Sequence, residues 1–366
     1  MFLRRTYLES RFSLPNAGER TTDIAMREPI TNIWIEFRCA NGTTSNVANL
    51  LADCVDAIEV IDGSDVIYAL DGKEALALTA YYCDDVPNQL ITELPNNTQN
   101  LSIVIPFGRF EGDPMYAFEP GRFLNPQVRV KWNLANVRAV GVTGFLTGGL
   151  VYTVVATCME GGESAKGYLM TKEIYSYVSA VGVEYVDLPT DYPYKALLVR
   201  HEQAGKHIFQ GISNIMLHVN QQQYVLFNMR MTDFIRYNSA IEPLLHMTQQ
   251  FFVASAAVVP FVFKYDEHPA FTCINVPDTV YNYQYLALGQ GILTETTGGA
   301  PQGAAIETDA QVSGYCPFGA VIHNFGRRDE PGDYFDAPAF RSCRLELTGG
   351  VAGSDCYVAL VQARPY

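Results

Sequence analysis

Two parts of this sequence present a strand, a turn and a second strand in the same order, and this repetition constrains the fold more than any other feature. The segments are NIWIEFR (32–38) with VDAIEVIDGSDVIYAL (55–70), and KALLVRHE (195–202) with ISNIMLHVNQQQYVLF (212–227). Ile58 aligns with Ile215, and Tyr68 with Tyr224, at almost the same spacing. A nearly constant spacing over a whole structural unit is what a duplication leaves behind. The chain is therefore predicted to contain two copies of one β-sandwich.

The ends of the two halves also match. FGRFEGDPMYAF (107–118) and FGRRDEPGDYFDA (325–337) share Phe-Gly-Arg, an acidic Gly/Pro turn and aromatic residues. Similar closing strands follow: VRVKWNL (128–134) and YTVVAT (152–157), then CRLELTG (343–349) and YVALVQ (357–362). In each copy a strand is expected to end at this turn before the chain re-enters the same sheet. Pro106-Phe107 also aligns with Pro260-Phe261, and the sequence leaves both pairings open.

The composition favours an all-β chain of two domains. Its 366 residues exceed the size of about 250–300 residues at which one hydrophobic core stops growing. The 22 Tyr, 20 Phe, 29 Gly and 19 Pro favour strands and turns over long helices. Val128, Val130 and Trp132 alternate with polar residues, as in a strand with one buried face. Residues 241–258 fit a helix and a strand equally well.

Prolines and loop composition suggest where the domains divide. The predicted parts are an N-terminal arm (1–28), a first domain (29–188) and a second domain (189–366) with a loop insertion around 265–314. Two prolines in DLPTDYPY (187–194) interrupt the strand pattern between the domains. The insertion has about fifty to sixty residues, and insertions in repeated units usually form loops. Within it, residues 289–314 lack aromatic side chains and are rich in Gly, Ala and Thr, so an irregular surface loop is expected.

The order of these parts resembles a known viral family. YVDLPTDYPYKALLVRHE followed by ISNIMLHVNQQQYVLF is similar to the crossover into the second domain of the double jelly-roll major capsid proteins of icosahedral viruses. The resemblance is closest to those of internal-membrane-containing phages. It implies an all-β fold of two tandem eight-stranded jelly rolls with short helices in loops. It also implies homotrimers of pseudo-hexagonal outline that tile a shell, with the 289–314 loop as an outward tower.

The resemblance further implies a place and partners. The protein would be assembled in the host cytoplasm and located in the virion capsid. Its partners would be itself, neighbouring capsomers, penton or other minor capsid proteins, and internal membrane lipid. The N-terminal arm of the family often lies on the inner side of the shell. Here that arm carries apolar and basic side chains that suit anionic lipid: Phe2, Leu3, Arg4, Arg5 and Arg11. Packing of the arm against a neighbouring subunit is the alternative.

The charge and the cysteines exclude other classes. A net charge of −14 argues against a surface for specific nucleic-acid binding, which needs Lys and Arg. Residues 1–14 lack the apolar core of a secretory signal, and the longest apolar run, 251–263, is too short to span a bilayer. Eight cysteines without a CxxC pair suit neither a disulfide scaffold nor a zinc site. They are expected to be buried, reduced thiols.

No recognisable catalytic motif is present. All six histidines lie in the second half, but no HxH pair of a bicupin occurs. The acidic turn around Asp329, Glu330, Asp333 and Asp336 lacks EF-hand spacing. We therefore predict no enzyme activity, no catalytic residue, no cofactor and no metal ligand. The alternatives are a carbohydrate- or receptor-binding β-sandwich, such as a spike or lectin-like protein, and a bicupin or glycosidase-type enzyme, because 39 acidic residues supply many carboxylate pairs.

Overall fold

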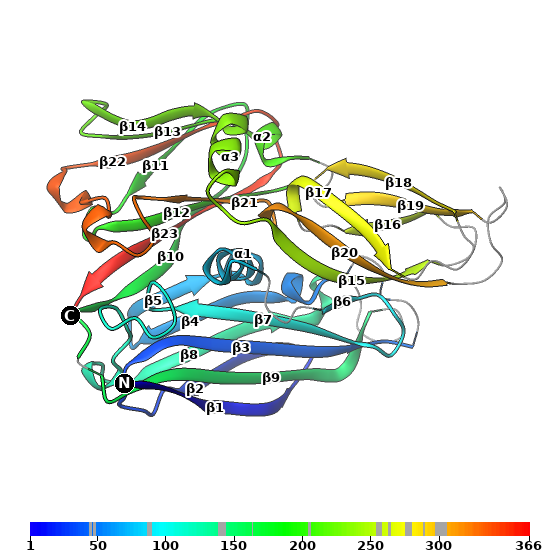
Figure 1. Ribbon diagram of the computed structural model, residues 1–366, viewed down its shortest axis with the longest axis horizontal. Coiled ribbons are helices and arrows are strands. Elements are labelled where there is room, and N and C mark those ends of the chain that lie inside the picture. Colours follow the sequence, from blue (N-terminus) through cyan, green and yellow to red (C-terminus); the bar gives the residue numbers. More distant parts are fainter. Residues whose placement is uncertain are drawn as a thin grey trace.

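The structure is a computed structural model in which most of the chain is described (Figure 1). The residues outside the description are 44–45, 47–48, 86–89, 138–143, 163, 204–205, 254–257, 263–264, 275–279, 288–289 and 297–305. For Leu90, Gln249 and the other residues of 251–310, the backbone alone is described.

The first β-sandwich consists of eight strands in two sheets. One sheet has the order β1 (Phe2–Leu14), β9 (Phe145–Glu160), β3 (Ile30–Asn41) and β7 (Thr98–Pro106). The other has the order β2 (Ala17–Asp23), β8 (Pro126–Asn133), β4 (Val55–Asp62) and β5 (Asp65–Leu70). Counted along the chain, the strands follow the orders 1-8-3-6 and 2-7-4-5. This is the connectivity of a jelly roll.

The second β-sandwich repeats this connectivity. One sheet has the order β10 (Gly167–Val178), β23 (Asp355–Pro365), β12 (Tyr194–Glu202) and β21 (Ala320–Asn324). The other has the order β11 (Gly182–Leu188), β22 (Cys343–Gly349), β13 (Ile212–Val219) and β14 (Tyr224–Arg230). The strand orders are again 1-8-3-6 and 2-7-4-5. The predicted fold class of two tandem eight-stranded jelly rolls is therefore confirmed.

The repeated Phe-Gly-Arg segments occupy equivalent places. Phe107 directly follows β7 and Phe325 directly follows β21, and these are the sixth strands of the two jelly rolls. Phe261 lies instead in β16 (Val258–Val262), so its alignment with Phe107 is wrong. The alignment of Tyr68 with Tyr224 is also wrong, because the turn at residues 220–223 is longer than the turn at residues 63–64.

Two of the predicted domain boundaries differ from the strand pairing. The expected arm at residues 1–28 forms β1 and β2, which pair with β9 and β8 as edge strands of the first jelly roll. The expected first domain at 29–188 includes β10 and β11, but these pair with β23 and β22 of the second jelly roll. The jelly rolls thus span residues 2–160 and 167–365. A local sequence pattern does not show which distant strand these strands pair with.

Additional strands follow the fifth strand of each jelly roll. After the fifth strand of the first jelly roll comes β6 (Leu90–Thr92). After that of the second come β15 (Leu245–Val253), β16, β17 (Tyr265–Ile274), β18 (Val280–Ala287), β19 (Gln290–Thr296) and β20 (Ile306–Pro317). β6 pairs in parallel with β15, and β16, β19 and β18 form a separate sheet. The prediction of an irregular loop at 289–314 is therefore wrong for its described residues. Antiparallel pairing on both sides makes β19 and β20 strands despite their lack of aromatic residues.

The helices are short and lie in connections, as predicted. They are α1 (Gly72–Cys83), α2 (Ile208–Gly211) and α3 (Met231–Ser239), with 3-10 turns at Leu51–Cys54, Pro120–Arg122, Leu134–Asn136, Pro331–Asp333 and Ala337–Ala339. α1 directly follows β5 and α3 directly follows β14, so the helices are equivalent in the two copies. A capping box starts α1: Asp71 accepts from the Glu74 N–H, and the Glu74 carboxylate accepts from the Asp71 N–H.

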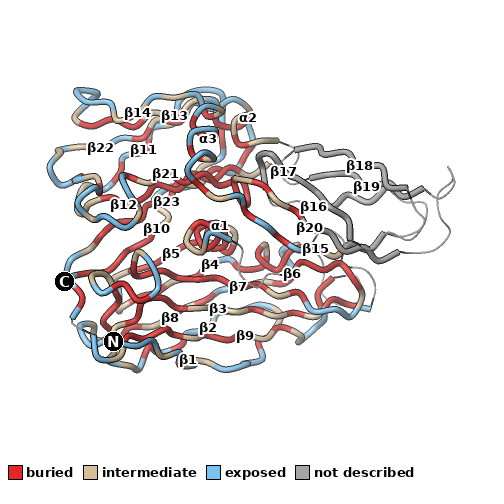
Figure 2. The backbone as a smooth tube through the Cα atoms, viewed as in Figure 1, coloured by how far each residue is buried: buried red, intermediate tan, exposed pale blue. Residues whose placement is uncertain are grey.

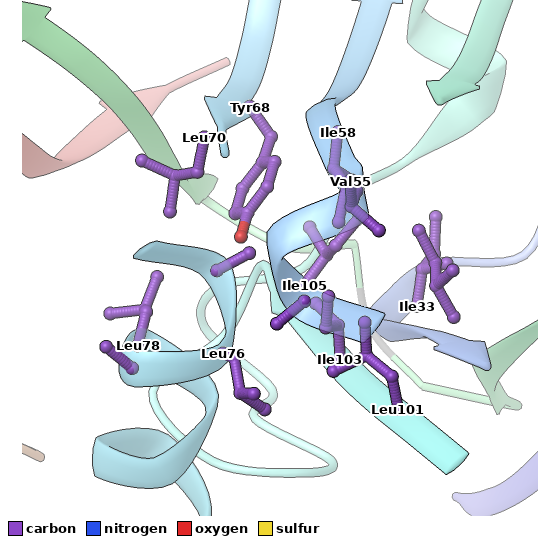
Figure 3. Packing of buried hydrophobic residues seen from close by; sticks show 14 of the residues in the cluster. Ile33, Val55, Ile58, Tyr68, Leu70, Leu76, Leu78, Leu101, Ile103 and Ile105 are labelled. Atoms are coloured by element: carbon purple, nitrogen blue, oxygen red, sulfur yellow. The ribbon is translucent and has the colours of Figure 1, made fainter. Parts of the chain in front are cut away.

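The main hydrophobic core extends from the first jelly roll into the second. Its buried residues include Ile58, Ile103 and Leu76 together with Ala359 and Val361 of β23. Figure 2 shows buried backbone in both sandwiches. α1 lies between the two jelly rolls in Figure 1 and packs its apolar side chains toward β5 and β7 in Figure 3. A second buried cluster fills the second jelly roll. The two jelly rolls therefore share a core rather than being joined by a flexible linker.

Candidate assembly interface

The junction between the jelly rolls starts from a short parallel pairing of β5 with β10. Tyr68 lies opposite Thr171, and Ala69 lies opposite Lys172. Through this pairing one eight-stranded sheet runs continuously from the first jelly roll into the second. Leu78 of α1 and Ala196 of β12 then line one small cavity at this junction.

Buried charges cross this junction. Arg200 of β12 is 1% exposed and donates from Nη2 to Asp71 Oδ2 at 2.6 Å and from Nη1 to Glu202 Oε2 at 2.8 Å. Burial opposes the charge of Arg200, but the carboxylates of Asp71 and Glu202 keep its pKa above the ordinary value. Lys73 of α1 pairs with Glu202 and, at 2.8 Å, with Asp53. The first turn of α1 is therefore bound electrostatically to the second jelly roll.

Neutral hydrogen bonds complete the junction. Tyr81 of α1 donates its hydroxyl to the Ala320 carbonyl at 2.9 Å. The Leu169 N–H donates to the Phe107 carbonyl at 2.8 Å, which ties β10 to the first Phe-Gly-Arg segment. At the C-terminal end, the Tyr366 hydroxyl donates to the Ala117 carbonyl at 2.7 Å. A shared buried cluster and these bonds therefore join the two jelly rolls.

The predicted contact residues of the N-terminal segment all lie on β1. Phe2 is 66% exposed and Leu3 is 42% exposed. Arg4 pairs with Glu160 at 2.5 Å, and Arg5 pairs with Glu111 at 3.1 Å. Arg11 has a φ of 49° and donates its backbone N–H to a threonine hydroxyl of β9. The strand thus exposes apolar side chains, while two of its three arginines are already ion-paired.

The second jelly roll has a groove that was not predicted from the sequence. It has a volume of about 700 Å³ and lies between β14, α3, β21 and residues 331–340. Its lining is mainly aromatic: Tyr224, Phe227, Phe234, Tyr237, Phe325, Tyr334, Phe335 and Phe340. His323 lies edge-on to Phe227 and Phe325, and burial lowers the pKa of His323 to about 4. The imidazole is therefore neutral near pH 7.

The acidic turn and the cysteines have structural partners. Asp333 pairs with Arg327 at 2.6 Å, and this hydrogen bond lowers the Asp333 pKa. Of the seven cysteines with described side chains, six are buried and Cys83 is half-buried, and all seven are free thiols. Within the described part of the chain, no cluster of His, Cys, Asp and Glu is placed to hold a metal ion. The helices that the structure describes include none long and apolar enough to span a bilayer.

The similarity of this chain to known proteins lies in its structure. No family model and no curated protein sequence matches it, whereas solved structures do. The major capsid protein of STIV (Sulfolobus turreted icosahedral virus) superposes with a TM-score of 0.59 at 10% identity, over 100% of this chain and 97% of that protein. The major capsid protein of bacteriophage PM2 gives 0.57 at 7% identity, over 99% and 98% of the two chains.

A third structure, the capsid of PBCV-1 virus, gives a TM-score of 0.55 at 10% identity over 99% of this chain and 93% of that one. This chain is a double jelly roll. The similarity covers both jelly rolls and the junction between them, as the resemblance in the sequence predicted. Because the identities are 7–10%, the similarity concerns the fold and not the sequence.

Proposed function

We propose that the protein is the major capsid protein of an icosahedral virus and that three copies form a pseudo-hexagonal capsomer. The observation that carries this proposal is the match of the whole double jelly roll to the STIV and PM2 major capsid proteins, over 97% and 98% of their lengths. Function resides in sites rather than folds. Here the relevant site is the broad outer surface of two rigid, covalently joined sandwiches.

The architecture suits a shell subunit physically. A shared core and buried ion pairs hold the jelly rolls in one orientation, so each copy offers the same faces to every neighbour. Identical rigid subunits with heterologous contacts form closed rings when the rotation closes. Three copies would place six similar jelly rolls around one axis, which accounts for a hexagonal outline from a trimer.

Further parts of the proposal concern location and partners. The protein would reside in the virion capsid after assembly in the host cytoplasm, and would contact neighbouring capsomers and penton or other minor capsid proteins. We propose no enzymatic role. For Phe2, Leu3, Arg4, Arg5 and Arg11 we favour a contact with a protein neighbour over internal membrane lipid, because Arg4 and Arg5 already pair with carboxylates. That pairing weakens attraction to anionic headgroups.

Native mass spectrometry tests the capsomer directly. The purified protein is expected to have about three times the 40.6 kDa mass of one chain, because the exposed strand edges and apolar side chains need a partner. Obligate interfaces of this kind often bury more than about 2,000 Å², so the species should survive dilution to low micromolar concentration. A monomer at that concentration would contradict the proposal.

One observation favours a second function. The aromatic groove beside α3 has side chains such as Tyr224 and Tyr237 that are 60% and 57% exposed, and exposed aromatic rings bind sugar faces in many proteins with carbohydrate sites. A carbohydrate- or receptor-binding protein would bind glycans on an array as a monomer. The capsid proposal instead expects these side chains to be covered when copies of the chain assemble.

A further inference from the structure

Among the open strand edges of the double jelly roll are those of β1 and β14. β1 and β14 are terminal strands of their sheets, and no described strand pairs with their outer edges. They lie at opposite ends of the molecule in Figure 1, so they cannot pair within one chain. The strand equivalent to β1 in the second jelly roll is β10, and the strand equivalent to β14 in the first jelly roll is β5. These two strands pair with each other. An open edge presents unpaired N–H and C=O groups and is a template for another chain.

We propose that β14 and α3 of one copy bind β1 and β3 of a second copy, in the way that β5 and α1 bind β10 and β12 within one chain. This inference rests on the proposed capsomer, since it names the contact that joins its subunits. The occupant of the β14 edge is thus a second copy of this chain.

A β-bulge that occurs in both β1 and β10, the first strands of the two jelly rolls, aligns these strands. In β1 the pairing with β9 skips Leu8, and in β10 the pairing with β23 skips Ile174. Each is a β-bulge, a feature that sets the local geometry of a strand. Because the bulges are equivalent, Thr6 in β1 occupies the place that Lys172 occupies in β10. Lys172 is one of the two β10 residues that pair with β5.

A second pair of bulges aligns the fifth strands. The pairing of β5 with β4 skips Ile67, and the pairing of β14 with β13 skips Leu226. Asn228 in β14 therefore occupies the place of Ala69 in β5, which lies opposite Lys172. The register follows: Thr6 of one copy lies opposite Asn228 of the next, in a parallel pairing.

The same alignment reveals a reversal of charge. Asp71 caps the N-terminus of α1, and Arg230 holds the equivalent position before α3. Arg200 in β12 pairs with Asp71, whereas the equivalent residue of β3 is Glu36. Arg230 is exposed and makes no ion pair with any described residue. An Arg230–Glu36 pair between copies would reproduce the Asp71–Arg200 pair with both signs exchanged.

The neighbouring charges follow the same rule. Within β12, Arg200 pairs with Glu202 at 2.8 Å, and within β3, Glu36 pairs with Arg38 at 2.7 Å. The two strands thus carry the same ion pair in opposite order. With this reversal, Asp71 before α1 of the first jelly roll matches Arg200 in β12 of the second. Arg230 before α3 of the second jelly roll likewise matches Glu36 in β3 of the first. Like-charge contacts penalise every other combination.

Apolar side chains support the same contact. Leu78 of α1 is buried and lines a small cavity with Ala196 and Val361 of the second jelly roll. The equivalent residue of α3 is Tyr237, which is 57% exposed, and Ile241, just past the end of α3, is 62% exposed. Neighbouring exposed apolar side chains of this kind indicate a surface that a partner covers.

Crosslinking tests the register. A Thr6→Cys, Asn228→Cys variant treated with a short bismaleimide is expected to give covalent dimers and trimers, because neighbouring strands lie about 4.8 Å apart. In the matched control, Thr6→Cys with Tyr224→Cys, the second thiol is displaced by about 13 Å along the strand, so little crosslinking is expected. Lys172→Cys with Ala69→Cys should crosslink within one chain. This variant is the positive control, because these two residues lie opposite each other in the β5–β10 pairing.

Charge exchange tests the ion pair. Arg230→Glu is expected to raise the dissociation constant of the subunits by about 30-fold or more. Combining it with Glu36→Arg should restore association, since each copy then carries the exchanged pair. Arg341→Glu, a change at an exposed position two residues before β22, should leave association unchanged.

The outcomes separate this inference from the proposed function. A native trimer without Thr6–Asn228 crosslinks, or with unchanged association of Arg230→Glu, would overturn the inference and leave the capsomer standing. A monomeric wild-type chain would overturn both. Flotation of the protein with phosphatidylserine vesicles, lost on Arg5→Ala and accompanied by no crosslinks, would assign β1 to a membrane surface instead.

Discussion

Replacing Arg200 with alanine is expected to destabilise the protein by about 3–5 kcal/mol, the range found when one partner of a buried ion pair is removed. Arg200 is 1% exposed, and its loss leaves Asp71 without its cation across the junction. It also removes the guanidinium that stacks 4.2 Å from the Tyr357 ring centroid. Urea denaturation at fixed protein concentration measures the change in the free energy of unfolding.

Arg327 provides the control for this prediction. It also pairs with an aspartate, Asp333, but its side chain is 76% exposed. Solvent screens such a pair, so Arg327→Ala should leave the denaturation midpoint unchanged. Equal effects of Arg200→Ala and Arg327→Ala would show that the junction is not held by buried charge.

Replacing Phe107 with alanine is expected to cost about 3–5 kcal/mol through the cavity that it leaves. Phe107 is fully buried and stacks on Phe118 with ring centroids 4.9 Å apart. Phe118 in turn packs on Phe123 at 4.6 Å, so the first Phe-Gly-Arg segment anchors an aromatic cluster. Thermal and urea unfolding should both shift.

Two further positions sharpen the Phe107 prediction. Phe110, three residues later, is 43% exposed, and its replacement by alanine should cost less than about 1 kcal/mol. Phe325, the equivalent of Phe107, lines the open aromatic groove, so water can occupy part of the space that Phe325→Ala creates. Its effect should lie between the other two. An effect of Phe110→Ala as large as that of Phe107→Ala would contradict the packing described.

The central strands of both jelly rolls could be predicted from the sequence, but their outer strands could not. β3 and β4 align with β12 and β13 because these largely buried strands carry strong apolar patterns. β1 and β2 contain RRTYLES and AGERTTD, and such polar edge strands lack the alternation of a buried face. β10 follows β9 along the chain but pairs with β23, and no local pattern encodes a partner so far away.

The candidate interface was only partly visible in the sequence. The apolar residues of β1 stood out, whereas Arg230 and the exposed face of α3 did not, because their meaning depends on which residues α1 buries. One signal was present: NIWIEFR has Glu36 before Arg38, while KALLVRHE has Arg200 before Glu202. Aligned through the duplication, these segments already carry the reversal of charge. The bulges that fix the alignment appear only in the strand pairing.

Electron cryomicroscopy of the purified oligomer can resolve how the copies contact one another. We expect three copies whose six jelly rolls surround one axis, with the contact between copies repeating the contact of β5 and α1 with β10 and β12. A particle in which the two jelly rolls of a chain separate, or in which copies meet through unrelated faces, would contradict this expectation.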